Sequence, residues 1–392
     1  MTDFLPDGVY FDLPEDVYFA QERFSKSDVK KIRVSPADWW AESYLNESPF
    51  PLTDAQIEAR EKARVLGRAY HCARLEPDRL DERFVRQLEK GDFDSEKLLT
   101  SDSAVKARLK ELGQQQTIKG ETPEERAQRL LGLDDGSLIW SVELARWQED
   151  AGQRQPIAGL FWDQMLVDQD HLRASLPIHQ MLSGGAAEVS ILWTCQDTGM
   201  RLSSRLDYLK GDAWAELKTF SNPNGKELEQ CLRDAVMFNG YYIDVAFQLQ
   251  ALRAARDLPA FGSSDGSPYP FESEILEQLN ALRDEPSHSI IFQQKGGVPN
   301  IVSRSLELWR LPLDAAMIEG ALSHDERADL WRNRKIPSAV HQRALIEIES
   351  AKRTFLQYSQ VYERGEPWLP FDPVGRITDY DFPPYWLEKE VK

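Results

Sequence analysis

Three short runs of β-prone residues, separated by tight turn signals, constrain the fold of this chain more than any other feature. Residues 187–195 (AEVSILWTC), 200–210 (MRLSSRLDYLK) and 214–220 (WAELKTF) are rich in branched and aromatic side chains. Asp-Thr-Gly at 197–199 and Gly-Asp at 211–212 lie between them and are typical of turns. We therefore expect a β meander, because strands joined by such short connections pair with one another.

Helical patterns flank this meander on both sides. Residues 53–76 repeat small and apolar side chains at steps of three and four, which places them on one helix face. The pattern over 226–256 is also helical and breaks near Gly240. Further helices are expected at 161–182 and 343–365, and further strands at 289–295 and 301–311. Together these elements predict an α/β fold in which helices flank a mixed central sheet.

The length of 392 residues allows one elaborated domain or two. Four segments can be distinguished: 1–80, the charged and weakly periodic 81–160, 161–300 with the meander, and 301–392 with a late helix and a tail rich in proline and aromatic residues. We expect one integrated domain. In it, 81–160 is an insertion of helices and loops, and the terminal segments add helical elaborations.

The net charge of −18 argues against a protein that coats nucleic acid non-specifically, because such coating needs Lys and Arg to neutralise phosphates. It does not exclude a confined DNA channel, since net charge says little about a local patch. In one stretch, 201–226, basic residues outnumber acidic ones. The basic residues are Arg201, Arg205, Lys210, Lys218 and Lys226, and the acidic ones are Asp207, Asp212 and Glu216. A metal site that faces phosphate would have this bias, and scattered surface charge explains it equally well.

Three widely spaced cysteines (Cys72, Cys195 and Cys231) indicate reduced thiols in a cytoplasmic protein rather than a zinc site or a disulfide framework. Residues 1–16 lack the basic and apolar regions of a signal peptide. No run approaches the length of a membrane span, so we expect no membrane partner.

The second and third strands carry the strongest chemical pattern. Side chains alternate along a strand, so Glu216 and Lys218 share one face. The short turn at 211–212 can place Asp207 beside Glu216 on that surface. Two converging acids repel each other unless a cation compensates, and Mg²⁺ suits a site with few carboxylates and a substrate phosphate. Solvated strand charges are the alternative, because short acid-acid-lysine patterns are common.

These residue types suit metal-dependent phosphodiester hydrolysis. A bound metal generates hydroxide and stabilises charge on the scissile phosphate. Lys218 can hold the attacking water or the developing charge. Glu188, at the start of the first strand, can add a ligand or orient a bound water. The phosphate-binding motif GxxxxGK[ST] does not occur in the sequence, which argues against ATP hydrolysis through a P-loop.

Several motifs follow one another along the chain and together resemble one family. Residues 188–220 combine an E-x-S-x-x-W element, a T-G turn, an R-x-D strand and an E-x-K-T strand. FSKSDVKKIRVSPADWW at 24–40, LGRAYHCARLEP at 66–77 and the late PWLPFDP…FPPYW carry further similarity. In this order they resemble exonuclease VIII (RecE-type) proteins of the PD-(D/E)XK nuclease superfamily. The resemblance spans most of the chain, with residues 80–160 poorly covered.

The resemblance implies a restriction-endonuclease-like PD-(D/E)XK core and roles for several residues. Asp207 and Glu216 match the family's metal ligands, Lys218 its catalytic lysine and Glu188 its upstream acid. His71 matches the helix histidine, which is a metal ligand or a contact of a metal-bound water. A histidine packed in the core is the alternative for His71.

Four basic residues are candidates for DNA contacts: Arg201, Arg205, Lys226 and Arg233. Arg205 approaches phosphate in this interpretation, and a strand ion pair is the alternative. Related nucleases carry Q-x-x-x-Y on the helix after the lysine strand, whereas this chain has Arg233 and Met237 at the matching places. Arg233 can hold phosphate in place of the glutamine or be a solvated helix residue, so DNA contacts near this helix can differ from those of the family.

The function that the resemblance implies is an Mg²⁺-dependent exodeoxyribonuclease, with Mn²⁺ as a substitute. It would degrade linear duplex DNA 5′→3′ in phage-type recombination, as a homo-oligomer with a single-strand annealing protein as partner. An endonuclease or single-strand nuclease of the same superfamily is one alternative. A non-catalytic DNA-binding recombination scaffold is another, although a scaffold has no need of the intact Glu216-x-Lys218 pair.

Overall fold

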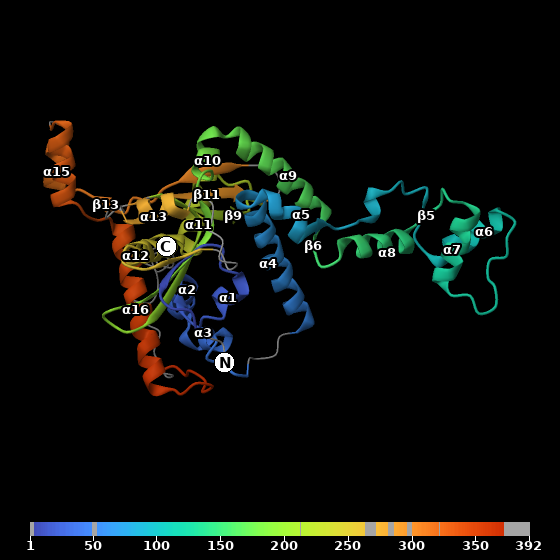
Figure 1. The fold of residues 1–392 in the computed structure, drawn as a ribbon, viewed down its shortest axis with the longest axis horizontal. Helices are drawn as coiled ribbons and strands as arrows, with labels where there is room; N and C mark the ends of the chain where they lie inside the picture. Colours follow the sequence, from blue (N-terminus) through green and yellow to red (C-terminus); the bar gives the residue numbers. More distant parts are fainter. Residues whose placement is uncertain are drawn as a thin grey trace, which may run out of the picture.

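A mixed β-sheet forms the centre of the molecule, with helices packed around it (Figure 1). The computed structural model describes residues 4–48, 53–211, 213–262, 272–280, 286–295, 300–320 and 322–371. The strands lie in the order β10-β1-β7-β8-β9-β11-β12, and β2 pairs with β8 beside them. Their bounds are β1 (Gly8–Tyr10), β2 (Phe24–Ser25), β7 (Ala186–Thr194), β8 (Arg201–Lys210), β9 (Ala213–Phe220), β10 (Ala260–Phe261), β11 (Ser287–Gln294) and β12 (Ile301–Arg304).

The predicted meander is the middle of this sheet. β7, β8 and β9 pair antiparallel, as short turns require. β11 runs parallel to β9, since helices between them return the chain across the sheet; these include α11 (Leu228–Phe238) and α12 (Tyr241–Ala255). β12 pairs antiparallel with β11, and β1 with β7. The α/β fold with a mixed central sheet is therefore as expected.

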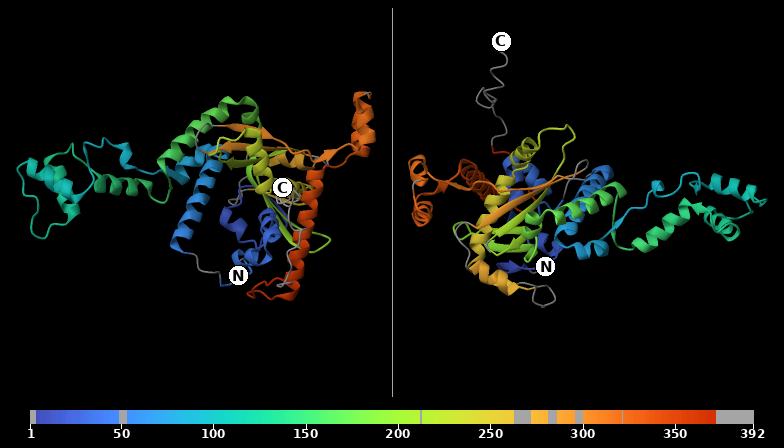
Figure 2. Two further views of the ribbon diagram at one scale, coloured as in Figure 1. Left: turned by 180° about the vertical axis from the view of Figure 1, so that it is seen from behind. Right: turned by 90° about the horizontal axis from the view of Figure 1, so that it is seen from above.

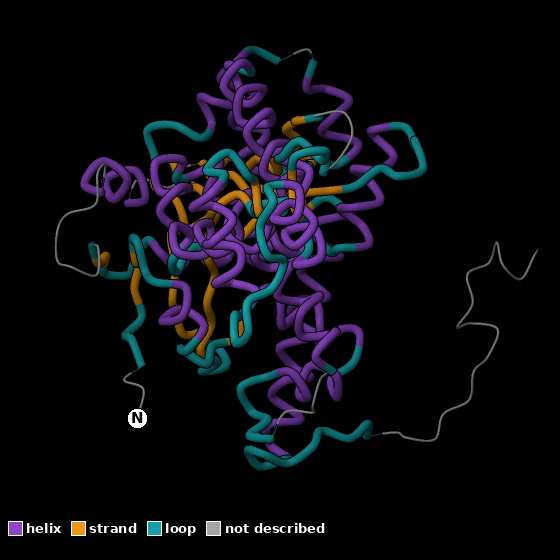
Figure 3. The backbone as a smooth tube through the Cα atoms, turned by 90° about the vertical axis from the view of Figure 1, so that its right-hand side faces the viewer, coloured by secondary structure: helices purple, strands orange, loops and turns teal. Residues whose placement is uncertain are grey.

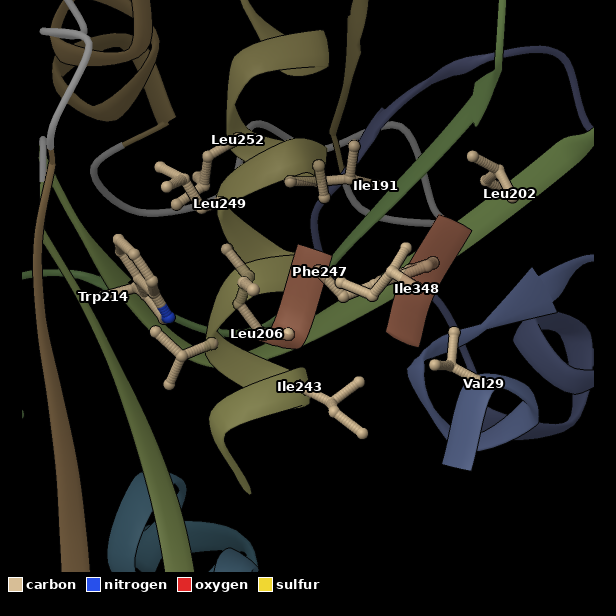
Figure 4. Close-up of a cluster of buried hydrophobic side chains, with 14 of the residues drawn as sticks. Val29, Ile191, Leu202, Leu206, Trp214, Ile243, Phe247, Leu249, Leu252 and Ile348 are labelled. Atoms are coloured by element: carbon tan, nitrogen blue, oxygen red, sulfur yellow. The ribbon is translucent and has the colours of Figure 1, made fainter. Parts of the chain in front are cut away.

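The largest core lies between one face of the sheet and the helices α2 (Lys26–Val34), α3 (Pro36–Glu42), α12 and α16 (Ala339–Val361). Figure 4 shows part of it around Val29, Ile191, Leu206, Phe247 and Ile348. α12 lies within this core and is buried almost all round, as its largely apolar sequence predicts. Two polar residues of α12 reach the sheet: Gln248 bonds to Glu216 of β9, and Asp244 lies 3.9 Å from the Lys218 ammonium.

A second group of helices contributes to the opposite side: α4 (Asp54–Leu75), α9 (Gly159–Ala174) and α10 (Leu176–Met181). Figure 3 shows the strands enclosed by helices. Thr53 and Gln56 form a capping box that begins α4, and Tyr70 packs against Met165 of α9. α9 in turn joins the sheet, because Leu172 shares a core with Leu217 of β9 and Ile291 of β11, so α4 is held near the sheet through α9.

The segment between β3 (Phe84–Arg86) and β6 (Gln155–Ile157) projects from the body as an arm (Figures 1 and 2). β3 and β6 pair in parallel at its base. The arm has an apolar core of its own, formed by residues such as Leu109 and Leu130. Its elements are η2 (Lys90–Asp92), β4 (Leu98–Leu99), α6 (Asp102–Glu111), α7 (Pro123–Leu133), β5 (Leu138–Ile139) and α8 (Trp140–Ala151). The arm lies within the range 81–160 that the sequence marks as an insertion.

Two local expectations differ from the structure. The helix expected at 161–182 divides into α9 and α10 at Ser175, because Pro177 in the first turn of α10 cannot continue a helix. The strand expected at 301–311 is two short strands, β12 and β13 (Trp309–Arg310). The remaining elements are α1 (Glu15–Phe19), η1 (Pro77–Arg79), α5 (Leu80–Arg83), α13 (Glu272–Asn280), α14 (Leu313–Glu319), α15 (His324–Arg334) and β14 (Ile336–Pro337).

The helices of the described ranges include none that is both long and apolar enough for a membrane crossing. Most of the tail that the sequence marks as rich in proline and aromatic residues, 372–392, lies outside the described residues.

Candidate metal centre

The backbone of β7 is irregular at Glu188. Ala187 belongs to the core beneath α9 and α10, whereas Val189, two residues on, belongs to the core beneath α12. In a regular strand these two side chains share a face. The change of face occurs at Glu188. Its φ of +53° is unfavourable for a residue with a Cβ. Such strained residues concentrate at functional sites, so this outlier directs attention to the Glu188 carboxylate.

In β8, too, side chains two residues apart point to opposite faces of the sheet, at the position opposite Glu188. Leu206 and Tyr208, again two residues apart, belong to different cores, and the ladder between β8 and β9 ends at Tyr208. Carboxylates accept the backbone N–H groups just beyond this point. Leu217 N–H donates to Oδ2 of Asp207 at 2.7 Å, and Asp207 N–H donates to Oε1 of Glu216 at 3.4 Å. The opening between the strands therefore holds both acids in place.

Three possible metal ligands converge here, namely His71 from α4, Glu188 from β7 and Asp207 from β8. One ligand atom of each lies within 4.8 Å of the other two, and we call these three residues the ligand group. Nδ1 of His71 is 3.6 Å from Oε1 of Glu188 and 3.9 Å from Oδ1 of Asp207. Their side chains are 33%, 29% and 10% exposed, so solvent reaches the group. One imidazole and two carboxylates fit a divalent cation that keeps water ligands.

The charges at the ligand group favour a cation. Burial raises the pKa of Asp207, and the carboxylate of Glu216 raises it further. Burial acts to lower the pKa of His71, but Asp207 and Glu188 outweigh it, and this pKa lies above its ordinary value. The raised pKa of His71 reflects the two neighbouring carboxylates, and that of Asp207 reflects burial first and the carboxylate of Glu216 second; a proton or a metal ion relieves both effects.

Glu216 lies next to the ligand group but is engaged elsewhere. Its side chain is 1% exposed and accepts hydrogen bonds from Lys218 Nζ at 2.6 Å, from Lys26 Nζ at 3.0 Å and from the amide of Gln248. Burial opposes ionisation, yet the two lysines hold the pKa of Glu216 well below its ordinary value. We call these four residues the ion-pair cluster. The predicted ligand Glu216 is thus beside Asp207, with its carboxylate turned toward lysines.

Lys218 connects the ion-pair cluster with the ligand group. Burial acts to lower the pKa of Lys218, but the carboxylates of Glu216 and Asp207 raise it well above its ordinary value. The ammonium group therefore stays charged at neutral pH. Lys218 and His71 line the same small cavity, whose volume of about 10 Å³ is close to the space that one water molecule needs.

Sequence reasoning missed Lys26, Asp244 and Gln248. Asp244 pairs with Lys30 at 2.8 Å and lies 3.9 Å from the Lys218 ammonium. Asp244 and Gln248 are four residues apart on the largely apolar α12, and this spacing is a signal that could have found them, because buried polar groups need partners. No local pattern distinguishes Lys26, whose role depends on how α2 packs on the sheet.

Arg205 is held by the protein itself. It donates to Oγ of Ser190 at 2.9 Å and to the carbonyl of Leu13 at 2.6 Å. Its Nε lies 3.9 Å from Glu188, and its guanidinium lies 4.4 Å from the centre of the Tyr18 ring. These contacts match the strand ion pair that the sequence leaves open as the alternative to a phosphate contact.

The other three DNA candidates do not gather at the ligand group. Arg201 lies at the opposite end of β8, roughly 20 Å from Asp207 at the rise of a β-strand. Lys226 follows β9 and pairs with Asp234 at 3.0 Å. Arg233 is exposed on α11.

The strain at Glu188 predicts different outcomes for two substitutions. Glu188→Gly should stabilise the metal-free protein by about 1 kcal/mol, because glycine adopts a positive φ without steric cost. Glu188→Ala keeps the Cβ and should gain less. Both variants should bind Mn²⁺ more weakly, by roughly tenfold or more. Urea unfolding and calorimetric Mn²⁺ titration measure the two effects, and equal stability of the variants would show that φ carries no strain.

Metal binding should depend on pH. Protons compete with a metal for His71 and Asp207, and the pKa of each is raised. Affinity for Mn²⁺ should therefore increase as the pH rises above the ordinary histidine pKa of about 6.5, because the raised pKa of His71 lets it keep its proton to a higher pH. His71→Ala should weaken binding and flatten this increase.

Calorimetry of wild type and His71→Ala at several pH values checks this expectation. The same samples distinguish a ligand from a packed core histidine. Loss of a packed histidine would cost about 1–3 kcal/mol of stability with or without metal. Unchanged Mn²⁺ affinity with an equal loss of stability in both states would remove His71 from the ligand group.

Comparison with known proteins gives no match, either to a protein-family model or to a curated protein.

Proposed function

We propose that this chain is a metal-dependent nuclease that hydrolyses phosphodiester bonds in DNA. The observation that carries the proposal is the ligand group, whose three residues converge within 4.8 Å beside the charged Lys218. An imidazole and two carboxylates that solvent can reach suit a divalent cation with open positions for water and phosphate. A purely structural metal site has no need of an adjacent lysine.

In this proposal the ligand group holds the cation, and Lys218 stabilises developing charge. His71, Glu188 and Asp207 would hold the cation, with Mg²⁺ as the proposed cofactor and Mn²⁺ as a substitute. A divalent cation bound there supplies positive charge for the substrate phosphate and acidifies a water molecule. The charge of Lys218 acts on both His71 and Asp207, and in this proposal its ammonium group holds the attacking water or donates to the oxygen on which negative charge develops.

Glu216 acts in this proposal chiefly by positioning Lys218. Its carboxylate accepts a 2.6 Å hydrogen bond from the lysine and is itself held by Lys26 and Gln248. Asp244 lies 3.9 Å from the same ammonium group. A lysine held in this way needs little rearrangement when charge develops, which is the advantage of a preorganised site.

DNA is the proposed substrate because the motifs over 24–40, 66–77 and 188–220 resemble those of exonuclease VIII-type nucleases. The same resemblance favours 5′→3′ digestion of linear duplex DNA in recombination, by a homo-oligomer that works with a single-strand annealing protein. An overall charge of −18 favours a confined path for DNA over a broad basic surface.

The test is digestion of linear duplex DNA labelled at the 5′ or the 3′ end, beside a closed circular plasmid. With Mg²⁺ or Mn²⁺ the linear DNA should be degraded, the 5′ label should be released first, and the circle should stay intact. Ca²⁺ should support binding better than cleavage, and EDTA should abolish cleavage. Cleavage of the circle would indicate an endonuclease. Full digestion in EDTA after dialysis, or no digestion with either metal, would overturn the proposal.

A further inference from the structure

An open pocket of about 390 Å³ adjoins β9 immediately after Lys218. Its lining begins at Thr219, continues through the loop after the strand, and is completed by α11. A volume at the lower end of the range for small-molecule sites suits one nucleotide, not a duplex. The side chains that give the pocket its chemistry are Asn222, Asn224, Lys226, Phe238, Asn239 and Lys295.

The pocket lies on the same side of the sheet as Lys218. Phe220, two residues after the lysine, belongs to the core that contains Cys231 and other residues of α11. A short chain of contacts joins the two places. The amide of Asn239 donates to the Tyr241 hydroxyl at 3.3 Å, and the Tyr241 ring centre is 5.4 Å from the Lys218 ammonium. A ligand in this pocket would therefore lie next to the reacting phosphate.

The lining suits a base better than a phosphate. Two lysines and one aspartate line the pocket, and Lys226 already pairs with Asp234 at 3.0 Å, so the positive charge there is partly neutralised and Lys295 carries the remainder. Phe238 is 72% exposed, which leaves its ring available for stacking. Side-chain amides both donate and accept hydrogen bonds, as the edges of bases require. An aromatic surface beside amides is the usual way to bind an unpaired base.

One asparagine of the lining has a structural role. The side chain of Asn222 accepts from the backbone N–H of Lys226 at 2.9 Å and donates to the carbonyl of the same residue at 2.8 Å. These two bonds close the loop that forms one wall of the pocket. Asn224 and Asn239 also line the pocket, and the side-chain carbonyl of Asn239 can still accept from a base while its NH2 group donates to Tyr241.

We propose that this pocket binds the base of one unpaired nucleotide, stacked on Phe238, in the strand whose phosphate lies at the ligand group. The inference rests on the proposed function for the identity of the substrate. It adds that the terminal base pair opens before cleavage and that the enzyme holds the freed base beside Lys218.

The test combines a protein variant with a change in the DNA. Phe238→Ala removes the stacking surface, and Met237→Ala is its matched control, because Met237 is the preceding residue of α11, is 55% exposed and does not line the pocket. The substrates are duplexes with one abasic nucleotide at each of the first few positions from the 5′ end. Cleavage is measured with Mg²⁺, and binding of the same DNA is measured by fluorescence anisotropy with Ca²⁺.

Wild type should lose about tenfold in cleavage efficiency and in affinity when the abasic nucleotide is at one particular position. On intact DNA, Phe238→Ala should have about tenfold lower cleavage efficiency and affinity than wild type, and the abasic nucleotide at that position should lower them no further. Met237→Ala should behave as wild type on both DNAs. A penalty that is equal in all three proteins, or the absence of any penalty in wild type, overturns the pocket proposal. If wild type binds DNA with the expected pattern but cuts none of it, the hydrolase proposal fails and the pocket stands.

Discussion

Replacement of Lys218 by alanine should lower the rate of DNA cleavage about 10²- to 10³-fold, which is the usual effect of removing one donor that stabilises developing charge. The fold should survive, because Glu216 keeps its bonds to Lys26 and Gln248. DNA affinity with Ca²⁺ should change little, since the lysine acts mainly on the transition state. Single-turnover cleavage and anisotropy separate the two quantities.

Lys26→Ala is the matched control for this experiment. Lys26 and Lys218 both bond to Oε2 of Glu216, at 3.0 and 2.6 Å, and their side chains are 17% and 16% exposed. They differ in that Lys218 lines the cavity that it shares with His71. Loss of Lys26 should therefore reduce cleavage much less than loss of Lys218. Equal effects of the two substitutions would mean that both lysines only support Glu216.

Glu216→Gln should destabilise the protein by about 3–5 kcal/mol, the usual cost of leaving buried charges without their partner. Glu216 is 1% exposed and bonds to two lysines, so both ammonium groups would face a neutral amide. Such a loss is a large part of the stability of an ordinary domain. Cleavage should fall as well, because Lys218 would lose its main anchor. Urea unfolding and nuclease assays on the same preparation measure both effects.

A second substitution distinguishes charge from packing at Glu216. Glu216→Gln combined with Lys26→Met removes one of the two ammonium groups that have lost their carboxylate partner. The double variant should recover part of the stability without restoring cleavage. If the double variant is no more stable than Glu216→Gln, the loss comes from packing of the amide.

The stability difference between wild type and Glu216→Gln should also depend on pH. The folded-state pKa of Glu216 is lowered, so its contribution is complete above the unfolded-state value of about 4.3 and is lost as the pH falls toward the folded-state value. The two proteins should therefore approach each other in stability below about pH 4. A constant difference down to the acid transition would argue against the ion pairs as its cause.

Local sequence patterns determined the frame of the site. Turn signals and β-prone runs over 187–220 predict the meander, and strand alternation alone puts Glu216 and Lys218 on one face. Periodicity and a capping residue likewise predict α4, the helix that carries His71. These features depend on residues that are neighbours in the chain, so they can be found without a structure.

Tertiary packing decided which acids form the ligand group. The φ of +53° at Glu188 and the matching change of face in β8 arise because each strand serves two different cores, and no local pattern shows this. His71 meets Glu188 and Asp207 only because α4 packs against the body of the protein.

Packing also turned Glu216 from an expected ligand toward Lys26 and Gln248, which come from helices far apart in the sequence. A buried charge depends on its partner for stability more than an exposed one does, because an unpaired charge away from water has a high free energy. Alternation along a strand is a property of consecutive residues, whereas burial and the pairing of charges exist only once distant segments have come together. The sequence by itself therefore indicated that two acids and a lysine meet on one surface, and the tertiary structure determined which of them belongs to the ligand group and which pairs with lysines.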